Sequence, residues 1–346
     1  MIMRLAINAA ALLLGAGVAH FIVGPPTARA AIQPLELTAR PVQLSPDDPA
    51  VDQVGKLGWR GGIALSSPER RFGGVSDLRF DAGCGRFLAV SDTGAWLIFA
   101  PVEDNGRLLG ITAGSIAPIR DERGNTPARK ADGDSEAIAI TRDGNSHVWF
   151  ERDNRAQTYP GISACTPESL AQAAAGTLRP AAIARWPANG GPEAADRFWD
   201  GQFILAEAQT DGEGRHVGHL LDARGAVRAD VTIRLPPDFQ PTGLAQLGED
   251  ADGVTYLLLL RRFSPLSGVA VIVMRVTVPA EGGEVEGEEI ARLRPPLSVD
   301  NMEGIAVRKE GGRTMVYLVS DNNFNMLQRT LLMKFELLEQ EKGGNP

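Results

Sequence analysis

Three glutamates recur at similar intervals along the sequence, and each one directly precedes a short apolar run. Glu136, Glu193 and Glu303 stand at aligned positions of five related segments. Asp77 and Gly243 occupy the same position in the other two segments, and the separations along the chain are 59, 57, 50 and 60 residues. Carboxylate oxygens are the ligands that Ca²⁺ prefers in proteins. If the fold brings the five segments together, these acids predict a cation site.

A second set of polar residues follows the apolar strand of each segment. In an antiparallel hairpin the second strand returns to the edge where the first began, so the two ends lie side by side. The residues expected at this shared edge are Asp92, Glu151, Glu207, Arg261, Arg262, Asp321 and Asn322. Carboxylates gathered there would repel one another unless protons or a cation compensate their charge. The predicted ligands of a Ca²⁺ ion at this edge are Glu136, Glu193, Glu303 and Asp321.

The alternative is that these acids only cap turns. Asp and Asn favour turns because their side chains accept hydrogen bonds from nearby backbone N–H groups. Asp81, Asp143 and Asp200 are expected to do so at the opposite edge. For a single acid at the shared edge the two interpretations are evenly balanced. Glutamate is a poor turn former, however, and three glutamates that each precede a strand favour the cation site.

The elements that must position these residues are short strands. From residue 57 to 338 the chain consists of apolar or alternating runs broken by Gly, Asp, Asn and Pro, the pattern of an all-β protein. The related segments cover residues 75–92, 134–153, 191–207, 241–262 and 301–321. A repeat of this size accommodates four short strands, which make one blade of a β-propeller. We predict a single β-propeller of five four-stranded blades, or six if residues 121–132 hide further strands, with the first strand of each blade along the central channel.

The two ends of the repeat region predict how the propeller closes. Residues 331–338 supply only one strand after the fifth segment, and residues 58–66 form a strand that has no blade of its own. Pairing these two strands completes the last blade and removes an open sheet edge. The propeller domain is then predicted to span residues 56–338, after a Pro-rich extended lead-in over 31–55 and before a polar tail over 339–346. One helix is expected, with Thr166 as its N-cap, Pro167 in its first turn and residues 168–175 after it.

The first 30 residues have the layout of a secretory signal peptide. Arg4 precedes an apolar run over residues 5–23, and a small-x-small cleavage site ends at Ala30. The alternative is an uncleaved membrane anchor, because the run is nearly long enough to span a bilayer; two glycines and a histidine weaken it as a span. We predict cleavage after Ala30, a periplasmic or secreted protein, and no contact with a membrane after cleavage.

Composition excludes several classes of partner and site. The chain has 35 Lys and Arg against 43 Asp and Glu, a net charge of −8, and no Lys/Arg-rich block. Nucleic acids and anionic lipids are therefore excluded as electrostatic partners. Two cysteines, Cys84 and Cys165, are too few for a cysteine-based zinc site. They either form one disulfide, which an oxidising compartment would favour, or remain two separate thiols.

The segments resemble the phytase-like domain family, also described as the "esterase-like activity of phytase" family, whose members are exported bacterial proteins. The stretches that carry the resemblance are FGGVSDL (72–78), VSDTG (90–94), DSEAIA (134–139), FER (150–152), NGGPEA (189–194), PTGL (241–244), LRRFS (260–264), NMEGIA (301–306), SDNNF (320–324) and QRTL (328–331). They occur in the family's order and cover about residues 55–338. The resemblance implies a propeller and, from the family's name, hydrolysis of an ester or phosphoester.

Two functional hypotheses follow. The first is a Ca²⁺-dependent hydrolase of a small ester or phosphoester, in which the metal binds substrate oxygens and lowers the pKa of a bound water. Glu136 and Glu303 would take part in catalysis, Arg261 or Arg262 would hold an anionic group, and the other polar residues of the edge would contact the substrate. The second is a non-catalytic exported propeller that binds a ligand or protein partner through the same edge. No lysine is expected at this edge, which disfavours a polyphosphate such as phytate as the substrate.

Overall fold

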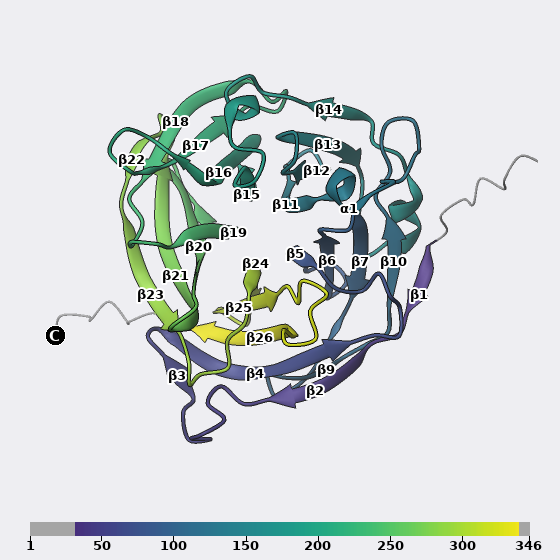
Figure 1. Ribbon diagram of the computed structural model, residues 1–346, viewed down its shortest axis with the longest axis vertical. Helices are drawn as coiled ribbons and strands as arrows, with labels where there is room; N and C mark the ends of the chain where they lie inside the picture. The colour runs from purple at the N-terminus through teal and green to yellow at the C-terminus, as the bar shows by residue number, and fades with distance from the viewer. Residues whose placement is uncertain (1–31, 339–346) are drawn as a thin grey trace, which may run out of the picture.

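The computed structural model describes residues 32–338, so the predicted signal peptide and polar tail lie outside the described residues. Five small sheets are arranged around a central axis, and each is one blade of a single β-propeller (Figure 1). This confirms the predicted all-β class, with five rather than six blades. Within the described residues, no helix is long and apolar enough to cross a membrane.

In every blade the first strand is innermost and the following strands add outwards. Blade one comprises β5 (Val75–Asp81), β6 (Arg86–Ser91), β7 (Ala95–Phe99), β10 (Gly114–Pro118) and β1 (Gln33–Leu35). Blade two comprises β11 (Ser135–Ile140), β12 (Asn145–Phe150), β13 (Arg155–Pro160) and β14 (Gly176–Leu178). Blade three comprises β15 (Pro192–Phe198), β16 (Gly201–Thr210), β17 (His216–Leu221), β18 (Val227–Ile233) and β22 (Gly283–Val285).

The last two blades complete the ring. Blade four comprises β19 (Gln240–Glu249), β20 (Gly253–Ser264), β21 (Gly268–Pro279) and β23 (Gly287–Leu293). Blade five comprises β24 (Met302–Glu310), β25 (Arg313–Ser320), β26 (Thr330–Leu337), β4 (Leu57–Ser66) and β2 (Thr38–Val42), with β3 (Gln53–Val54) beside β4. A separate hairpin, β8 (Pro101–Asp104) and β9 (Arg107–Ile111), extends from blade one.

The central strands are strongly apolar because each is covered by a neighbouring blade on both faces. In β20 successive side chains alternate between two cores. Tyr256, Leu258 and Leu260 pack between blades three and four, whereas Leu257 and Leu259 pack between blades four and five. The run of leucines is therefore the element that joins three consecutive blades.

The ring closes between the two ends of the chain, as predicted. β4 pairs with β26 in the last blade, with Ala64 opposite Leu331. The described part of the lead-in, residues 32–55, forms part of the blades: β2 covers the outer edge of β4, and β1 pairs with β10 at the outer edge of blade one. Leu35 and Leu44 of this segment are buried. The segment therefore fastens the last blade to the first.

The helix predicted after Thr166 is wrong in type and length. The chain instead forms a short 3₁₀-helix over Pro167–Ala171. Ala175 then donates a backbone hydrogen bond to the carbonyl of Thr158 at 2.8 Å, and β14 continues along the edge of β13. Because this pairing completes the sheet of blade two, it overrides the local helical propensity.

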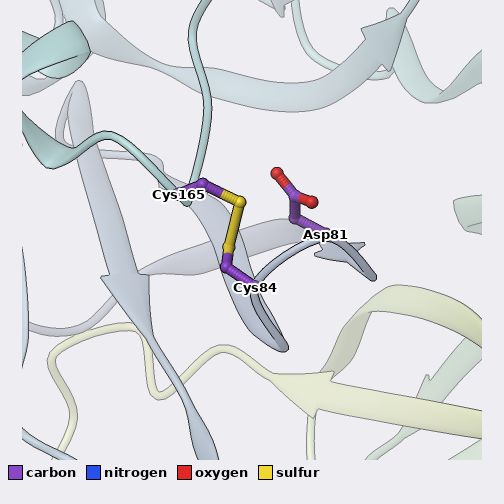
Figure 2. A group of neighbouring side chains, drawn as sticks. All are labelled: Asp81, Cys84 and Cys165. Carbon is purple, nitrogen blue, oxygen red and sulfur yellow. A yellow bond between two sulfur atoms is a disulfide. The ribbon is translucent and has the colours of Figure 1, made fainter.

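The two cysteines form a disulfide that ties blade one to blade two. Cys84 lies in the turn between β5 and β6, Cys165 lies in the segment after β13, and their Cα atoms are 5.5 Å apart (Figure 2). The neighbouring carboxylate of Asp81 accepts hydrogen bonds from the backbone N–H of Gly83 at 3.0 Å and the hydroxyl of Ser163 at 3.2 Å. Since β5 ends at Asp81, the bridge lies at the opposite end of the channel from the predicted site.

Candidate functional site

Each inner strand begins with a β-bulge, which leaves one residue out of the hydrogen-bonded ladder. The register of the five inner hairpins skips one residue near the start of β5, β11, β15, β19 and β24. A bulge re-aims the side chain of its extra residue, and here it does so at the equivalent point of every blade. We call the skipped residues the bulge ring: Ser76, Glu136, Glu193, Thr242 and Glu303.

A second ring lies where the second strand of each blade ends. In four blades the backbone N–H of one residue bonds to the carbonyl two residues before the bulge, at 2.8 to 3.1 Å: Asp92, Glu151, Glu207 and Asp321. Arg261 takes the same place in blade four, because it stands opposite Gln240 in the register. We call these five residues the strand-end ring, and the two rings together the acid mouth. The structure therefore brings seven of the predicted acids to one end of the channel.

Asp77 and Gly243 do not belong to the bulge ring, and their predicted alignment with the glutamates is wrong. The equivalent residues in blades one and four are Ser76 and Thr242, each one position earlier. A shift of one residue along a strand moves a side chain to the other face. The bulge adds that one residue without any change in the apolar pattern, so the sequence does not mark it.

Asp77 instead lies below the acid mouth, bound to Arg79. Its carboxylate is buried, accepts backbone hydrogen bonds from Leu78 and Ile138 at 2.8 and 2.9 Å, and meets the Arg79 guanidinium at 2.8 Å. Burial raises the pKa of Asp77 to about 7, although Arg79 and the two N–H donors act in the opposite direction. Asp196 lies 3.9 Å from the same guanidinium. Asp77 thus has structural partners and is not a residue of the mouth.

Arg79 occupies the middle of the channel. Its terminal nitrogens donate to backbone carbonyls of four of the five inner strands: Leu78 at 2.8 Å, Ile138 at 2.5 Å, Ala195 at 2.6 Å and Ile305 at 3.4 Å. The Arg79 side chain is only 11% exposed. It therefore separates the acid mouth from the opposite mouth, where a cavity of about 480 Å³ begins at Arg79.

Two groups of three carboxylates in the acid mouth are close enough to share a cation. In each group one oxygen per residue lies within 4.8 Å of the others, and the groups are Asp134, Glu136, Glu151 and Glu151, Glu193, Glu207. Two of the four predicted ligands, Glu136 and Glu193, fall in these groups. Glu303 and Asp321 fall in neither group: both belong to blade five, which does not adjoin blades two and three, and Glu303 pairs with Arg261.

Glu151 connects the two carboxylate groups. Its carboxylate accepts backbone hydrogen bonds from Gly190 and Gly191, and it also hydrogen-bonds to the carboxyl group of Glu193. Gly190 has a φ of +114°, a conformation that favours glycine, and this brings its N–H toward Glu151. A hydrogen bond between two carboxyl groups requires a proton on one of them. These acids are therefore held together either by protons or by a cation.

Two basic side chains compensate part of the negative charge. Arg261 bonds to Glu303 at 2.7 Å and reaches Glu207 at 3.3 Å. Lys130, on the one-turn helix α1 (Lys130–Gly133), lies 2.6 Å from Asp92. The prediction that no lysine reaches this edge is wrong, because α1 folds back from a connection whose structure the sequence does not indicate. With Asp134 included, eight acids surround these two cations in the described part of the mouth.

Burial and mutual repulsion raise the pKa of the acids in the mouth. Burial is the larger cause: it raises the pKa of Glu136 and Glu193 well above the usual range, and the neighbouring carboxylates add to the shift. Burial raises the pKa of Glu303 to about 8 against the pull of Arg261, and that of Asp321 to about 6. The mouth therefore favours protons or a cation over bare carboxylates.

Two carboxylate oxygens of the mouth are buried without a hydrogen-bond partner, Asp92 Oδ1 and Glu303 Oε2. Their side chains are 9% and 13% exposed, respectively. The second oxygen of each group is paired, with Lys130 and Arg261. Because a buried charged oxygen without a partner is costly, both oxygens indicate that the mouth lacks positive charge.

Two predicted site residues have other roles. The guanidinium of Arg262 lies 5.1 Å from the ring centre of Phe239, because successive residues of a strand face opposite sides and Arg261 takes the side of the channel. Asn322 Oδ1 accepts backbone hydrogen bonds from Gly74 at 3.2 Å and Phe324 at 3.1 Å, so it holds a loop at the edge of the mouth.

Asp134 is the acid that sequence reasoning missed. It lies two residues before Glu136, and its backbone carbonyl accepts the N–H of Glu151. The sequence feature that could have identified Asp134 is an aspartate and a glutamate separated by one residue at the start of an inner strand. Asp134 lies immediately before β11, and its carboxylate and that of Glu136 belong to the same group of three.

A family model covers most of this propeller and the whole of the acid mouth. The family described as "Phytase-like: Esterase-like activity of phytase" matches residues 70–324. The chain belongs to the phytase-like family. This confirms the resemblance seen in the sequence motifs.

Three solved structures share distant similarity with this phytase-like chain. The allergen Mala s 1 of Malassezia sympodialis is 14% identical, with 89% of this chain and 99% of that chain covered and a TM-score of 0.42. Virginiamycin B lyase from Staphylococcus aureus is 11% identical (89% and 90% covered, TM-score 0.37), and the Pan2 WD40 domain of Neurospora crassa is 11% identical (79% and 92%, TM-score 0.36). A search of curated proteins found no match. None of these similarities bears on function.

Proposed function

We propose that this phytase-like propeller binds Ca²⁺ in the acid mouth and hydrolyses a small ester or phosphoester there. The observation that carries the proposal is the pair of three-carboxylate groups that share Glu151. Ca²⁺ binds oxygen ligands at about 2.3–2.6 Å, so two of its ligands lie up to about 5 Å apart. The separation of at most 4.8 Å within each group is compatible with this geometry.

The side chains of the mouth support a hydrolytic role. A bound Ca²⁺ would polarise the ester or phosphoryl oxygen and lower the pKa of a coordinated water. Arg261, held by Glu207 and Glu303, would present a planar guanidinium, which suits a phosphate or carboxylate group. Lys130, beside Asp92 of blade one, would supply a second cation. Two cations around the metal groups favour a substrate with one or two negative charges.

We also infer that the protein acts outside the cytoplasm. The sequence predicts a signal peptide over residues 1–30. The bridge between Cys84 and Cys165 supports the same location, because disulfides persist in oxidising compartments such as the periplasm.

Calorimetric titration with Ca²⁺ tests the metal site. The wild type should release or absorb heat with saturation, and Glu151→Gln should abolish binding in both groups because it removes their shared ligand. Glu207→Gln should affect only the second group. Asp143→Asn is the matched control, since this aspartate caps a turn at the opposite mouth through Thr141 and Asn145. No heat with the wild type, or equal binding by Glu151→Gln, would refute the site.

A hydrolysis screen tests the activity separately. Para-nitrophenyl esters and phosphates should be cleaved in Ca²⁺ and not in EDTA. Arg261→Met should raise KM for the phosphate more than for a neutral ester, because it removes the proposed anion contact. Ca²⁺ binding without turnover of any of these substrates would favour the non-catalytic binding propeller instead.

A further inference from the structure

Exposed apolar side chains are concentrated on two loops beside the acid mouth. In the described part of the chain eight large hydrophobic residues are exposed, and five of them lie on these loops. Phe263 and Leu266 lie around the turn between β20 and β21, and Phe324, Met326 and Leu327 lie between β25 and β26. The first loop follows Arg261 by three residues and the second follows Asp321 directly, and both of these residues belong to the strand-end ring, so the two loops rise from the same face of the propeller. We call these five residues the apolar tips.

Three of the apolar tips are almost fully exposed. Leu266 and Met326 are 100% exposed, and Leu327 is 91% exposed. A single exposed leucine needs no explanation, but a cluster of apolar side chains on one face marks an interaction site. The loops belong to neighbouring blades, four and five, so the cluster is not the accident of one poorly packed turn.

The second loop is held in a strained backbone conformation. Asn323 and Phe324 have φ angles of +46° and +50°, which are rare for residues other than glycine and rarer still for a bulky aromatic. Asp321 Oδ1 accepts the N–H of Asn323 at 2.7 Å, and Asn322 Oδ1 accepts the N–H of Phe324 at 3.1 Å. Such strain persists only where the surroundings enforce it, commonly at functional sites. Side chains at the edge of the mouth thus hold Phe324 half-exposed.

Arginines lie at the base of both loops. Arg294 is exposed and is followed by Pro295, which lies next to Gly268 at the end of the first loop. Arg329 ends the second loop; its side chain is 48% exposed, and its Nε lies 3.6 Å from the carboxylate of Asp300. Apolar side chains in front of basic ones suit the boundary of a bilayer, where the apolar groups enter the acyl region and the cations meet phosphates.

We propose, against the expectation from the sequence that the mature protein has no contact with a membrane, that the apolar tips dock this face of the propeller on a phospholipid surface. The contact is mainly apolar, because the net charge of −8 gives the chain no electrostatic attraction to anionic lipid. A lipid surface fits the tips better than a folded partner does, since three of the five are nearly fully exposed and protein interfaces centre on side chains that fill packed pockets. The docking is independent of Ca²⁺ binding and of hydrolysis.

Co-sedimentation with vesicles of phosphatidylcholine, in EDTA, tests the docking with protein purified from the periplasm. The wild type should sediment with the vesicles. The variant Leu266→Ser/Met326→Ser/Leu327→Ser should bind at least tenfold more weakly with an unchanged melting temperature, because all three side chains are exposed. The matched control is Val102→Ser/Leu109→Ser on the β8–β9 hairpin, whose side chains are 43% and 51% exposed; it should bind as the wild type does.

Three outcomes would overturn the proposal. The first is no binding by the wild type, or equal binding by the triple variant. The second is binding that requires Ca²⁺ and ignores the triple substitution, which would assign the contact to the acid mouth. The third is a wild-type dimer in solution that the triple variant converts to a monomer, which would show that the tips bind a second copy of the chain.

Discussion

Both halves of the central channel contain buried charge, but only one of them compensates it. At the level of Arg79 one guanidinium meets Asp77 and Asp196 and donates to four backbone carbonyls. In the acid mouth eight acids surround Arg261 and Lys130, and two carboxylate oxygens have no partner. The same inner strands supply both levels, so the difference lies in the residues and not in the fold.

This difference distinguishes a stabilising network from a binding site. Hydrogen bonds from both terminal nitrogens of Arg79 make this level rigid, and its Nε, which has no hydrogen-bond partner, lies 3.9 Å from Asp196. Like charges without compensation destabilise a fold, and such groups occur mainly where a ligand supplies the missing charge. We therefore interpret the Arg79 level as the centre that holds the inner strands together, and the acid mouth as the place where the proposed cation would bind.

The largest effect is expected from Arg79→Met. Methionine keeps an unbranched apolar stem but removes the guanidinium from Asp77, Asp196 and the carbonyls, while the backbone N–H donors to both carboxylates remain. Breaking a buried ion pair costs about 3–5 kcal/mol, so the urea midpoint should fall steeply. Arg142→Met is the control, because this arginine is 52% exposed in its pair with Glu249 and should cost less than about 1 kcal/mol. Equal losses for the two variants would contradict a special role for Arg79.

The disulfide is expected to have the next largest effect on stability. It lies at the end of the channel opposite the acid mouth. Cys84 and Cys165 are 81 residues apart, and a cross-link of this kind stabilises a protein by about 2–4 kcal/mol. Cys84→Ala/Cys165→Ala should lose that amount and keep its Ca²⁺ affinity. Dithiothreitol should lower the melting temperature of the wild type but not of the double variant. Two free thiols in periplasmic protein, detected by mass spectrometry, would contradict the bridge.

The ring of blades is predictable from the sequence because its signals are local and repeated. Each inner hairpin repeats a polar start, a turn and an apolar strand. The last blade lacks a strand and residues 58–66 have no blade of their own, so this segment must pair beside residues 331–338. The lead-in is different. β1 and β2 are short, contain Pro34 and Pro41, and pair only with outer edges. Nothing in their composition indicates which edge they cover.

The acid mouth is predictable only in part. The recurrence of Glu136, Glu193 and Glu303 identifies the face of the propeller, because glutamate before a strand has no turn-forming reason to recur. The bulge shifts the ring by one residue and replaces Asp77 with Ser76, which no hydrophobic pattern reveals. Lys130 reaches the mouth from a connection of 121–132, where tertiary packing alone decides the path.

The third prediction concerns the pH dependence of stability, which should distinguish the carboxylate-lined mouth from a binding site without titratable groups. Glu303 has a pKa of about 8 in the folded protein and an ordinary value of 4.5 when unfolded. A raised folded pKa stabilises the fold below the unfolded value, and that contribution is lost as the pH rises through the folded one. At about 1.36 kcal/mol per pH unit, the free energy of unfolding in EDTA should fall by about 2 kcal/mol between about pH 6 and pH 7.5.

Chemical denaturation across this range measures the effect. Saturating Ca²⁺ should make the fall smaller, because a nearby cation favours ionised carboxylates. The pKa of Asp77, about 7, predicts a change of the same sign at the Arg79 level, so the part of the fall that Ca²⁺ removes belongs to the mouth. A free energy of unfolding that rises with pH in EDTA would contradict the raised pKa values.

The smallest effect is expected from Glu136→Gln, and its sign should depend on the metal. In EDTA the variant should be more stable than the wild type by about 1 kcal/mol, because it removes repulsion from Asp134 and Glu151 without a change in size. In saturating Ca²⁺ the order should reverse, since the wild type gains stability from a ligand that the variant binds less tightly. Thermal melts in both buffers measure the crossing, and Ser76→Ala, an uncharged change in the same ring, should show no crossing.

Destabilisation by Glu136→Gln in both buffers would mean that the glutamate serves the fold locally, as a turn cap does. The contrast between the mouth and the Arg79 level would then be one of degree.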